Sequence, residues 1–356
     1  MTTRYIKTHY RLMAGFLMLL ISSGGQAENA DSSKKKEINQ SFSVGLSEQL
    51  NVDNQYGSIT LTHWNQNEVA IRVVVESKAN NDNRAQEGLD RVQIELKKSG
   101  NTVYALTSFK NSLGWNNNRI TIDYYISMPP RLAAKLSQRY GNINLPETNE
   151  GKCELEVKYG NIKAGSFSEP LSIDAGYSNI NIEDVSDLKM DLAYCGNVTL
   201  RDARTLSIDS KYSHLNIRNA GKVDIDNQYG NIKIQQANSI SIESKYGNAN
   251  VDYIKEELNI GTLDYSTFTL KELNAGFKHV DAEARYGTLK LSISPQASFH
   301  VIAEDMKYGN VNINGLKITH SSVENKVDHH YRINGGGDQV IRFEGNNYSN
   351  LKINAL

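Results

Sequence analysis

The chain has 356 residues, and 39 Lys and Arg against 40 Asp and Glu leave a formal charge of −1. A nucleic-acid-binding protein would carry a clustered basic excess, so the charge balance argues against that class of partner. With 26 Gly, 5 Pro and 2 Cys, the composition also excludes a collagen-like chain, a Pro-rich linker and a disulfide scaffold.

The first 27 residues have the pattern of a secretory signal peptide. Three basic residues precede the apolar run Leu12–Ile21, and small residues lead up to Ala27. The run is shorter than the roughly 20 residues of a membrane span, and no second run follows. We therefore expect an exported protein, whether periplasmic, cell-surface or secreted, with no transmembrane segment in the mature chain. Residues 28–41 are polar and charged, which predicts a flexible lead-in.

Residues 42–130 predict a β-rich N-terminal cap region. Apolar and polar residues alternate in several short runs, and the helix-forming stretch 83–91 predicts one short helix. Met128-Pro129-Pro130 marks the boundary of this region. The expected strands are Phe42–Val52, Ser58–Thr62, Val69–Glu76, Val92–Lys97, Thr102–Ser108 and Ile120–Ser127.

From 131 to 356 a motif of the type Tyr-Gly-Asn-Ile recurs every 17 to 22 residues. Its tyrosines are Tyr140, Tyr159, Tyr177, Tyr194, Tyr212, Tyr229, Tyr246, Tyr265, Tyr286 and Tyr308. One copy stands upstream at Tyr56. Another follows the interrupting segment 309–347 at Tyr348, where we expect it to close the stack.

Numbered from Tyr as position 0, the repeat has apolar residues at −6, −4, +3 and +5, typical of strands with one buried face. The phase changes across the Gly-Asn pair, which predicts a tight corner there. A motif kept in phase over so many repeats favours stacked coils over a hairpin meander. The sequence therefore predicts an all-β, β-helix-like solenoid of about ten rungs over 131–356, with Tyr56 as an early rung.

Position −3 carries an acidic column. Its candidate ligand-facing members are Glu156, Asp174, Asp191, Asp209, Asp226 and Glu243, and the column continues at Glu283 and Asp305. Stacked coils would hold these carboxylates about 5 Å apart, where like charges repel. Five coils place a base two residues after the acid, at 156/158, 209/211, 243/245, 283/285 and 305/307, which favours a self-neutralised outer face.

Two members of the column, Asp174 and Asp191, lack such a base and are weak candidates for a shared Ca²⁺ ion. Calcium usually takes six or more oxygen ligands, and two carboxylates would leave most of that shell to water. The sequence predicts no other metal site and no cofactor.

The tyrosines allow two interpretations. They could form a platform on which sugar rings stack, or they could pack inside the corner. Position 0 shares its phase with the buried −4 and −6 columns, and small residues often stand at −2, which favours packing. On that interpretation Tyr229→Ala should cost about 3 kcal/mol or more.

The two cysteines lie in different settings. Cys153 falls in the apolar −6 column and Cys195 is inserted at a corner two rungs further on. Two rungs span about 9–10 Å, beyond the Cα separation that a disulfide tolerates, so we predict no bridge.

The chain resembles the DUF4097-type candidate adhesins, β-strand-repeat proteins of bacterial envelopes. The resemblance covers about 42–356 and rests on the segment Asn54–Ile59, the Ile-Ser-Met-Pro-Pro entry and the Tyr-Gly-Asn-Ile rungs. It implies export and a binding or structural role, and it supplies no catalytic residues.

Besides a purely structural envelope component that another protein recognises, two functional hypotheses follow. The first is a non-enzymatic exported adhesin-like or scaffold protein that binds a surface glycan or an envelope protein through its solenoid faces. The alternative is a polysaccharide-active β-helix enzyme, which would need facing carboxylates about 5–10 Å apart in a cleft. Only 252–280 and 309–347 have spare length to build one.

Overall fold

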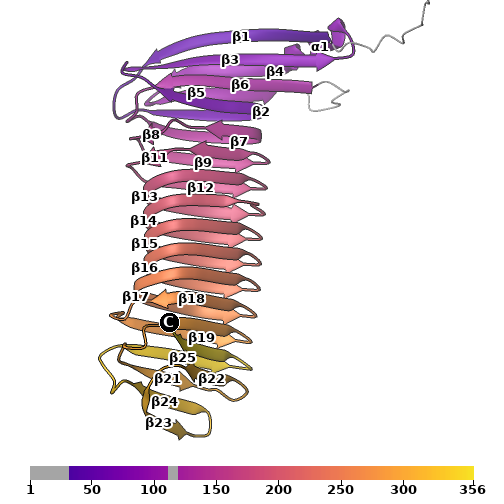
Figure 1. Cartoon of the computed structure of the whole chain (residues 1–356). Helices are drawn as coiled ribbons and strands as arrows, with labels where there is room; N and C mark the ends of the chain where they lie inside the picture. Colours follow the sequence, from indigo (N-terminus) through magenta and orange to yellow (C-terminus); the bar gives the residue numbers. More distant parts are fainter. Residues whose placement is uncertain (1–31, 111–118) are drawn as a thin grey trace, which may run out of the picture.

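Stacked coils form a long rod that carries a wider head at its N-terminal end (Figure 1). The computed structural model describes residues 32–110 and 119–356, so the predicted signal peptide and residues 28–31 lie outside the described residues. The described part is built almost entirely of strands, which confirms the all-β solenoid. Its one helix has ten residues, and no helix in the described ranges is long and apolar enough to cross a membrane.

Each central coil is a single strand that runs from one tyrosine corner to the next. These strands are β13 (Asn179–Ala193), β14 (Val198–Lys211), β15 (His214–Gln228), β16 (Asn231–Lys245) and β17 (Asn248–Asp264). They pair in parallel with equivalent residues side by side, such as Leu188 with Leu206. Identical positions therefore form columns along the rod.

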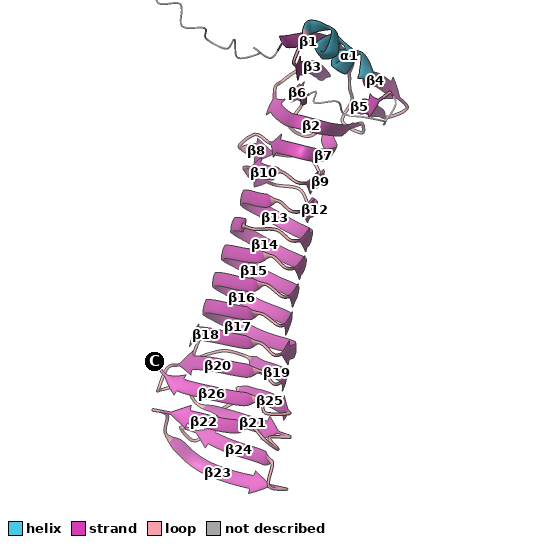
Figure 2. Cartoon of the chain, turned by 90° about the vertical axis from the view of Figure 1, so that its right-hand side faces the viewer, coloured by secondary structure: helices cyan, strands magenta, loops and turns pink. Residues whose placement is uncertain are grey.

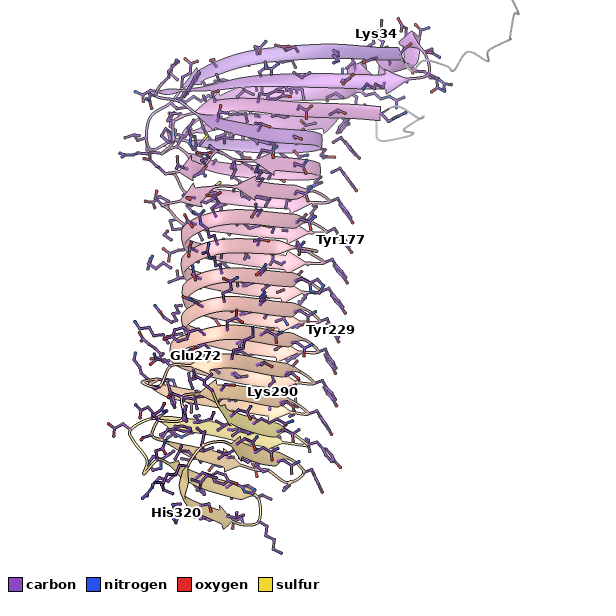
Figure 3. All side chains as sticks on the ribbon, in the orientation of Figure 1. Lys34, Tyr177, Tyr229, Glu272, Lys290 and His320 are labelled. Carbon is purple, nitrogen blue, oxygen red and sulfur yellow. The ribbon has the colours of Figure 1, made fainter. Side chains whose placement is uncertain are left out.

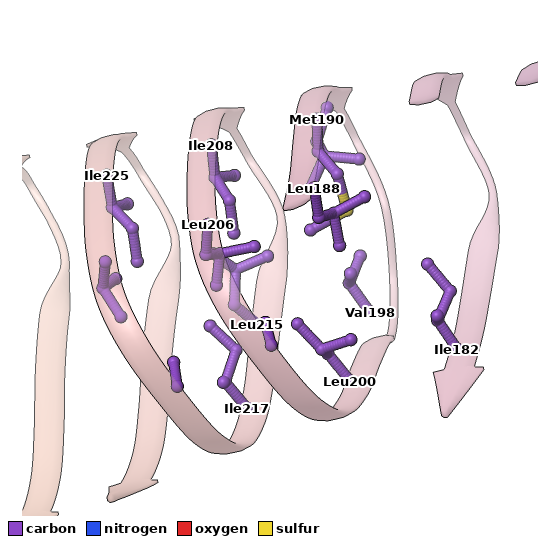
Figure 4. Packing of buried hydrophobic residues seen from close by; sticks show 14 of the residues in the cluster. Ile182, Leu188, Met190, Val198, Leu200, Leu206, Ile208, Leu215, Ile217 and Ile225 are labelled. Carbon is purple, nitrogen blue, oxygen red and sulfur yellow. The ribbon is translucent and has the colours of Figure 1, made fainter. Parts of the chain in front are cut away.

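The core lies between the two halves of each coil, because every strand bends partway along (Figure 4). In β15, Ile217 from the first half and Ile225 from the second half are both buried. The alternation of apolar and polar residues buries one side of each half and leaves the other in solvent. The outer faces and the corners of these coils are consequently the surfaces that they offer to a ligand.

Additional coils stand on both sides of the central ones. Towards the head lie β7 (Ala133–Asn144), β8 (Thr148–Asn149), β9 (Cys153–Lys158), β10 (Asn161–Ala164), β11 (Ser166–Phe167) and β12 (Leu171–Gly176). Beyond β17 lie β18 (Thr267–Leu273), β19 (His279–Arg285) and β20 (Thr288–Ile293). In these coils the two halves are separate strands, and the parallel pairing continues through them.

The first coil is β2 (Gln49–His63), with Tyr56 at its corner. It pairs with β7 along both halves, from Gln49 opposite Ala133 to Thr60 opposite Asn144. This confirms Tyr56 as an early rung. The chain between β2 and β7 forms the head, in which β5 (Thr102–Phe109) covers one half of β2 and β6 (Arg119–Met128) covers the other.

Antiparallel strands complete the head. β4 (Val92–Ser99) pairs with β5, β3 (Glu68–Ala79) pairs with β6, and the helix α1 (Asp82–Arg91) contacts β3 and β1 (Ser32–Ser43). Asn81 caps the N-terminus of the helix, and its side chain accepts a hydrogen bond from the Arg84 backbone N–H. The helix expected over 83–91 is confirmed.

The flexible lead-in was a wrong prediction for residues 32–41. They form most of β1 (Ser32–Ser43), which pairs antiparallel with the whole of β3. Its polar composition suits an edge strand, because only Ile38 and Phe42 pack against the core while Lys35 and Lys36 stay exposed. The single strand expected over Phe42–Val52 is also wrong, since a turn at 44–48 separates β1 from β2.

At the C-terminal end, spatial order departs from chain order (Figure 2). After β20 come β21 (Phe299–Glu304), β22 (Asn310–Asn314), β23 (Ile318–Glu324), β24 (Asp328–Ile333), β25 (Val340–Asn346) and β26 (Asn350–Ala355). β25 lies between β19 and β21, and β26 lies between β20 and β22.

The last coil of the sequence is therefore the penultimate coil of the rod. The expectation that Tyr348 closes the stack is wrong, because the Tyr308 coil lies outside it. Beyond the Tyr308 coil, β24 pairs antiparallel with β21 and β23 pairs antiparallel with β24. This hairpin gives the rod its end.

Candidate interaction surface: the tyrosine ridge

One edge of the rod carries an unbroken stack of tyrosine rings, which we call the tyrosine ridge (Figure 3). Neighbouring ring centroids are 4.7–6.1 Å apart and the ring planes are within 20° of parallel. In spatial order the ridge consists of Tyr56, Tyr140, Tyr159, Tyr177, Tyr194, Tyr212, Tyr229, Tyr246, Tyr265, Tyr286, Tyr348 and Tyr308. Tyr229 lies between Tyr212 and Tyr246, as the stacked-coil prediction requires.

The prediction that these rings pack inside the corner is wrong. From Tyr140 onward they are 45–63% exposed. The corner lies at the tyrosine itself, because every ridge tyrosine except Tyr308 has a positive φ, between 47° and 62°. A left-handed residue interrupts the strand alternation, so position 0 turns outward although −2 and −4 point inward.

A positive φ costs a residue with a Cβ roughly 1–2 kcal/mol, and here the same residue type adopts it repeatedly. Backbone pairing helps to hold the conformation: the Tyr229 N–H donates to the Lys245 carbonyl of the next coil at 2.9 Å, and the Tyr177 N–H donates to Ala193 at 3.0 Å. A repeated strained conformation that displays one side chain points to a role for that side chain.

The residue after each tyrosine fills the inside of the corner and is small. A Cβ on Gly160 would lie 1.7 Å from the Gly141 carbonyl oxygen. Where serine replaces glycine, its hydroxyl bonds within the corner, as Ser178 Oγ does by donating to the Gly176 carbonyl at 2.7 Å. The residue at +1 is small in every coil, which indicates that +1 fills the interior of the corner. This sequence signal could have shown that the tyrosine before it points outward.

Both cysteines are buried and free. Cys195 takes the small-residue position after Tyr194, with its Sγ 3.4 Å from the Ala175 carbonyl oxygen, and Gly196 is exposed. Cys153 lies in the core, where burial raises the pKa of its thiol to about 12. Neither thiol belongs to the ridge surface.

An amide-rich column, which we call the amide column, runs along one side of the ridge at position +2, or at +3 in the Tyr194 coil, where Cys195 is inserted. Its members bond to one another: Asn161 Nδ2 donates to Asn142 Oδ1 at 2.8 Å, and Asn179 Nδ2 donates to Asn161 Oδ1 at 2.9 Å. In spatial order the column is Asn142, Asn161, Asn179, Asn197, His214, Asn231, Asn248, Thr267, Thr288, Asn350 and Asn310. It contains no acidic residue.

The opposite side of the ridge, at position −1, is mostly basic, with one acid at Asp264, and we call it the basic flank. Its cations are Arg139, Lys158, Lys211, Lys245, Arg285 and Lys307. Two of them are neutralised in the structure, because Lys158 Nζ lies 3.2 Å from Glu156 and Arg285 makes two hydrogen bonds to Asp264. These bonds and the charge of Arg285 hold the pKa of the Asp264 carboxyl below its ordinary value.

The acidic column lies in register two residues further from the ridge. Glu156, Asp174 and Asp191 stand opposite one another on successive coils, and Asp209, Asp226 and Glu243 continue the row. Of the five same-coil pairs expected, the described residues contain an ion pair only for 156/158. Arg285 instead reaches across to the neighbouring coil.

Calcium binding at Asp174 and Asp191 stays a prediction. Both side chains are exposed. Over residues 32–110 and 119–356, no group of three or more His, Cys, Asp or Glu side chains is arranged to hold a metal ion.

A shallow hollow of about 440 Å³ lies on the outer face around Leu188, and it is relevant to the enzyme hypothesis. Its lining includes Asp187 and Asp224. Asp187 already accepts hydrogen bonds from Arg204 and Thr205, so it is not available as an unengaged carboxylate facing Asp224. The segments with spare length, 252–280 and 309–347, are largely used for strands β17 to β19 and β22 to β25.

Comparison with known proteins gives a limited result. No family model matches the chain, and no curated protein matches it. Among solved structures, a candidate adhesin from Parabacteroides distasonis ATCC 8503 is 13% identical with a TM-score of 0.31, covering 72% of this chain and 93% of its own. A candidate adhesin from Bacteroides fragilis NCTC 9343 is 13% identical with a TM-score of 0.28, over 89% and 97%.

A candidate lipid-binding protein from Parabacteroides distasonis ATCC 8503 is 12% identical with a TM-score of 0.29, over 71% of this chain and 93% of its own. At these identities and scores the similarities carry no functional argument. The case for a function therefore rests on the surface of the rod itself.

Proposed function

We propose that this chain is a non-enzymatic, exported protein of the adhesin or scaffold type that binds a surface ligand or an envelope partner through its solenoid surface. The observation that carries the proposal is the tyrosine ridge, a continuous row of half-exposed aromatic rings along one edge of the rod. Large contiguous exposed aromatic surface marks interaction sites in proteins that otherwise bury it.

The stacking decides how the ridge can bind. Each ring is sandwiched between its neighbours, as Tyr212 is between Tyr194 and Tyr229, so its faces are covered. What reaches solvent is a row of ring edges and hydroxyl groups at intervals of about 5 Å. The ridge therefore does not bind by stacking sugar rings on its aromatic faces. It binds by hydrogen bonds along the row of hydroxyl groups.

Because the surface repeats from coil to coil, it can bind a ligand strongly without a deep pocket. Each coil offers one phenol and one side chain of the amide column, and a ligand that spans several coils engages them simultaneously. Contacts that are weak singly add up when they are linked, because every contact after the first is intramolecular. An elongated partner fits this surface better than a small molecule does.

The test compares two four-site variants. The ridge variant carries Asn at Tyr177, Tyr194, Tyr212 and Tyr229, because Asn accepts a positive φ. The control variant carries Ser at Asn181, Thr199, Asn216 and Lys233, four outward residues on the same coils. Circular dichroism checks that both are folded.

Binding to immobilised envelope extract and to arrays of neutral and anionic glycans is then measured for both variants. The proposal predicts that the ridge variant loses binding while the control keeps it. Equal binding by both variants would contradict it. Release of new reducing ends from any glycan would favour the polysaccharide-active alternative.

Export and membership of the DUF4097-type family belong to the same proposal. The support is the basic-apolar-small pattern of residues 1–27 and the match of Asn54–Ile59 and the Tyr-Gly-Asn-Ile rungs. Fractionation of cells that express the full chain tests export: the mature protein should appear outside the cytoplasm and shortened by 27 residues.

A further inference from the structure

We infer that the tyrosine ridge pairs with the same ridge of a second copy, so that two rods lie side by side and parallel, with their N-terminal heads at the same end. This inference rests on the proposed function in taking the ridge as the binding surface, and it names the partner. Four properties of the surface support it: hydrogen-bonding chemistry, period, charge and area.

The chemistry of the ridge is self-complementary. A phenol hydroxyl both donates and accepts hydrogen bonds, and so does the amide of each Asn in the amide column. Two identical rows of such groups can satisfy each other. The acidic column cannot pair with itself in this way, because like charges repel.

The period of the ridge selects partners that share it. Ring centroids repeat at 4.7–5.2 Å from Tyr56 to Tyr286, since the spacing is set by hydrogen bonding between strands. A partner with another repeat loses register after a few coils. A second copy has the same repeat and keeps register along the whole ridge, which spans roughly 53 Å if twelve coils are about 4.8 Å apart.

Charge decides between the two orientations. Two ridges that meet in antiparallel fashion place basic flank against basic flank, and Lys211 and Lys245 then approach the same kind of cation on the other rod. In a parallel pair, related by a two-fold axis along the rods, each basic flank meets the partner's amide column. That column carries carbonyl oxygens and no acid, so the parallel pair avoids the repulsion.

The area is sufficient for a stable pair. From Tyr140 onward each ridge tyrosine exposes about half of its roughly 200 Å², so these eleven offer on the order of 1,000 Å² per copy before the amide column is counted. A typical specific interface takes about 800 Å² from each partner. Tyrosine is also among the residues enriched in such interfaces.

Sedimentation of the purified protein over a range of concentrations tests the association. We expect a dimer whose dissociation constant rises about tenfold or more in the ridge variant and is unchanged in the four-Ser control. A second variant with Phe at Tyr177, Tyr194, Tyr212 and Tyr229 keeps the rings and removes the hydroxyls, and it should also weaken the dimer. A wild-type protein that stays monomeric at every concentration would overturn the inference.

Single cysteines test the orientation in a background with Cys153→Ala and Cys195→Ser. In a parallel pair the amide column meets the partner's basic flank. A mixture of the Asn142→Cys and Arg139→Cys proteins should therefore cross-link at one end, and a mixture of the Asn310→Cys and Lys307→Cys proteins at the other. In an antiparallel pair amide column meets amide column, so only a mixture of the Asn142→Cys and Asn310→Cys proteins should cross-link, which would overturn the stated orientation.

The two proposals fail separately. If the wild type is monomeric but the ridge variant loses its envelope or glycan ligand, the pairing is wrong and the proposed function stands. If the dimer forms through the ridge but ligand binding is equal in all variants, the proposed function is wrong and the pairing stands.

Discussion

The middle of the rod and its C-terminal end are built from the same type of coil, but they differ in the order in which the coils are stacked. Between Tyr140 and Tyr286 each coil contacts the coil before and the coil after it in the chain. At the C-terminal end the Tyr308 coil and the β23–β24 hairpin come next in the chain after the Tyr286 coil. The Tyr348 coil, which is last in the chain, lies between the Tyr286 and Tyr308 coils. The ridge continues across both regions without a break.

The difference shows what holds each region. In the middle, the free energy comes from contacts between sequence neighbours, which is typical of repeat proteins. At the end, β25 and β26 are held on both sides by segments that precede them in the chain, so removal of the last residues separates two layers that are otherwise intact. The same out-of-order coil bridges Tyr286 and Tyr308 in the ridge.

The largest effect is expected from deletion of residues 338–356. It removes a layer whose Ile341, Phe343, Leu351 and Ile353 are fully buried. Four such side chains correspond to about 6 kcal/mol or more of burial free energy. Hydrogen exchange should show that 299–333 loses protection while the coils from Tyr140 to Tyr265 keep theirs.

Deletion of the exposed Leu356 alone is the control and should change little. If 299–333 stays protected in the longer deletion, the interposed position of the last coil is contradicted.

The next largest effect concerns the corner interior in the regular region. Gly160→Ala would place a Cβ 1.7 Å from a carbonyl oxygen, whereas at Gly176 the nearest atom is 3.8 Å away. We expect Gly160→Ala to lower the free energy of unfolding by about 1–3 kcal/mol or more. Gly176→Ala should stay within about 0.5–1 kcal/mol. Equal effects in urea denaturation would mean that adjacent corners do not approach as described.

Sequence reasoning succeeded where neighbours in the chain are neighbours in space. Periodicity was enough to predict the coils, the apolar columns at −6, −4, +3 and +5 and the acidic column, and the helix-forming residues of 83–91 predicted the helix. It placed the tyrosines in one row. It failed on the direction of the rings, because one left-handed residue reverses the alternation and composition does not show which residue adopts that conformation.

It also failed at both ends. Residues 32–41 looked too polar for a strand, yet an edge strand needs only backbone partners, which β3 provides. The order of the Tyr308 and Tyr348 coils could not be read from the repeat, since either order satisfies the local pattern. Non-local pairing decides it.

A smaller effect on stability distinguishes an exposed tyrosine ring from a packed one. Tyr229 is 47% exposed and has a φ of 58°, so Tyr229→Ala loses about half of the burial and keeps the unfavourable backbone. We expect a loss of about 1–2 kcal/mol in the free energy of unfolding. Tyr229→Gly should be no worse than Tyr229→Ala, because Gly adopts a positive φ freely. A loss of about 3 kcal/mol or more would indicate a packed ring.

The smallest effect is a pH dependence at the boundary of the two regions. Hydrogen bonds and charge from Arg285 lower the pKa of Asp264, so this carboxylate stabilises the fold above its ordinary pKa of about 3.9. The stabilisation is lost as the pH falls below that value through the lowered folded pKa. In Asp264→Asn the fall of Tm below about pH 4 should be flatter by about 2 °C. Asp209→Asn, on the exposed acidic column, is the comparison, and identical profiles would contradict the role of the pair.

Disulfide trapping at the C-terminal end tests most directly that all the coils, including the one out of order, build a single continuous ridge. Thr288 stands opposite Asn350, and Asn350 stands opposite Asn310. In the background with Cys153→Ala and Cys195→Ser, the pair Thr288→Cys with Asn350→Cys should form a disulfide, since adjacent strands lie about 4.8 Å apart. The pair Thr288→Cys with Asn310→Cys is two layers apart and should stay reduced. The reverse outcome, a bridge between 288 and 310 and none between 288 and 350, would contradict the account.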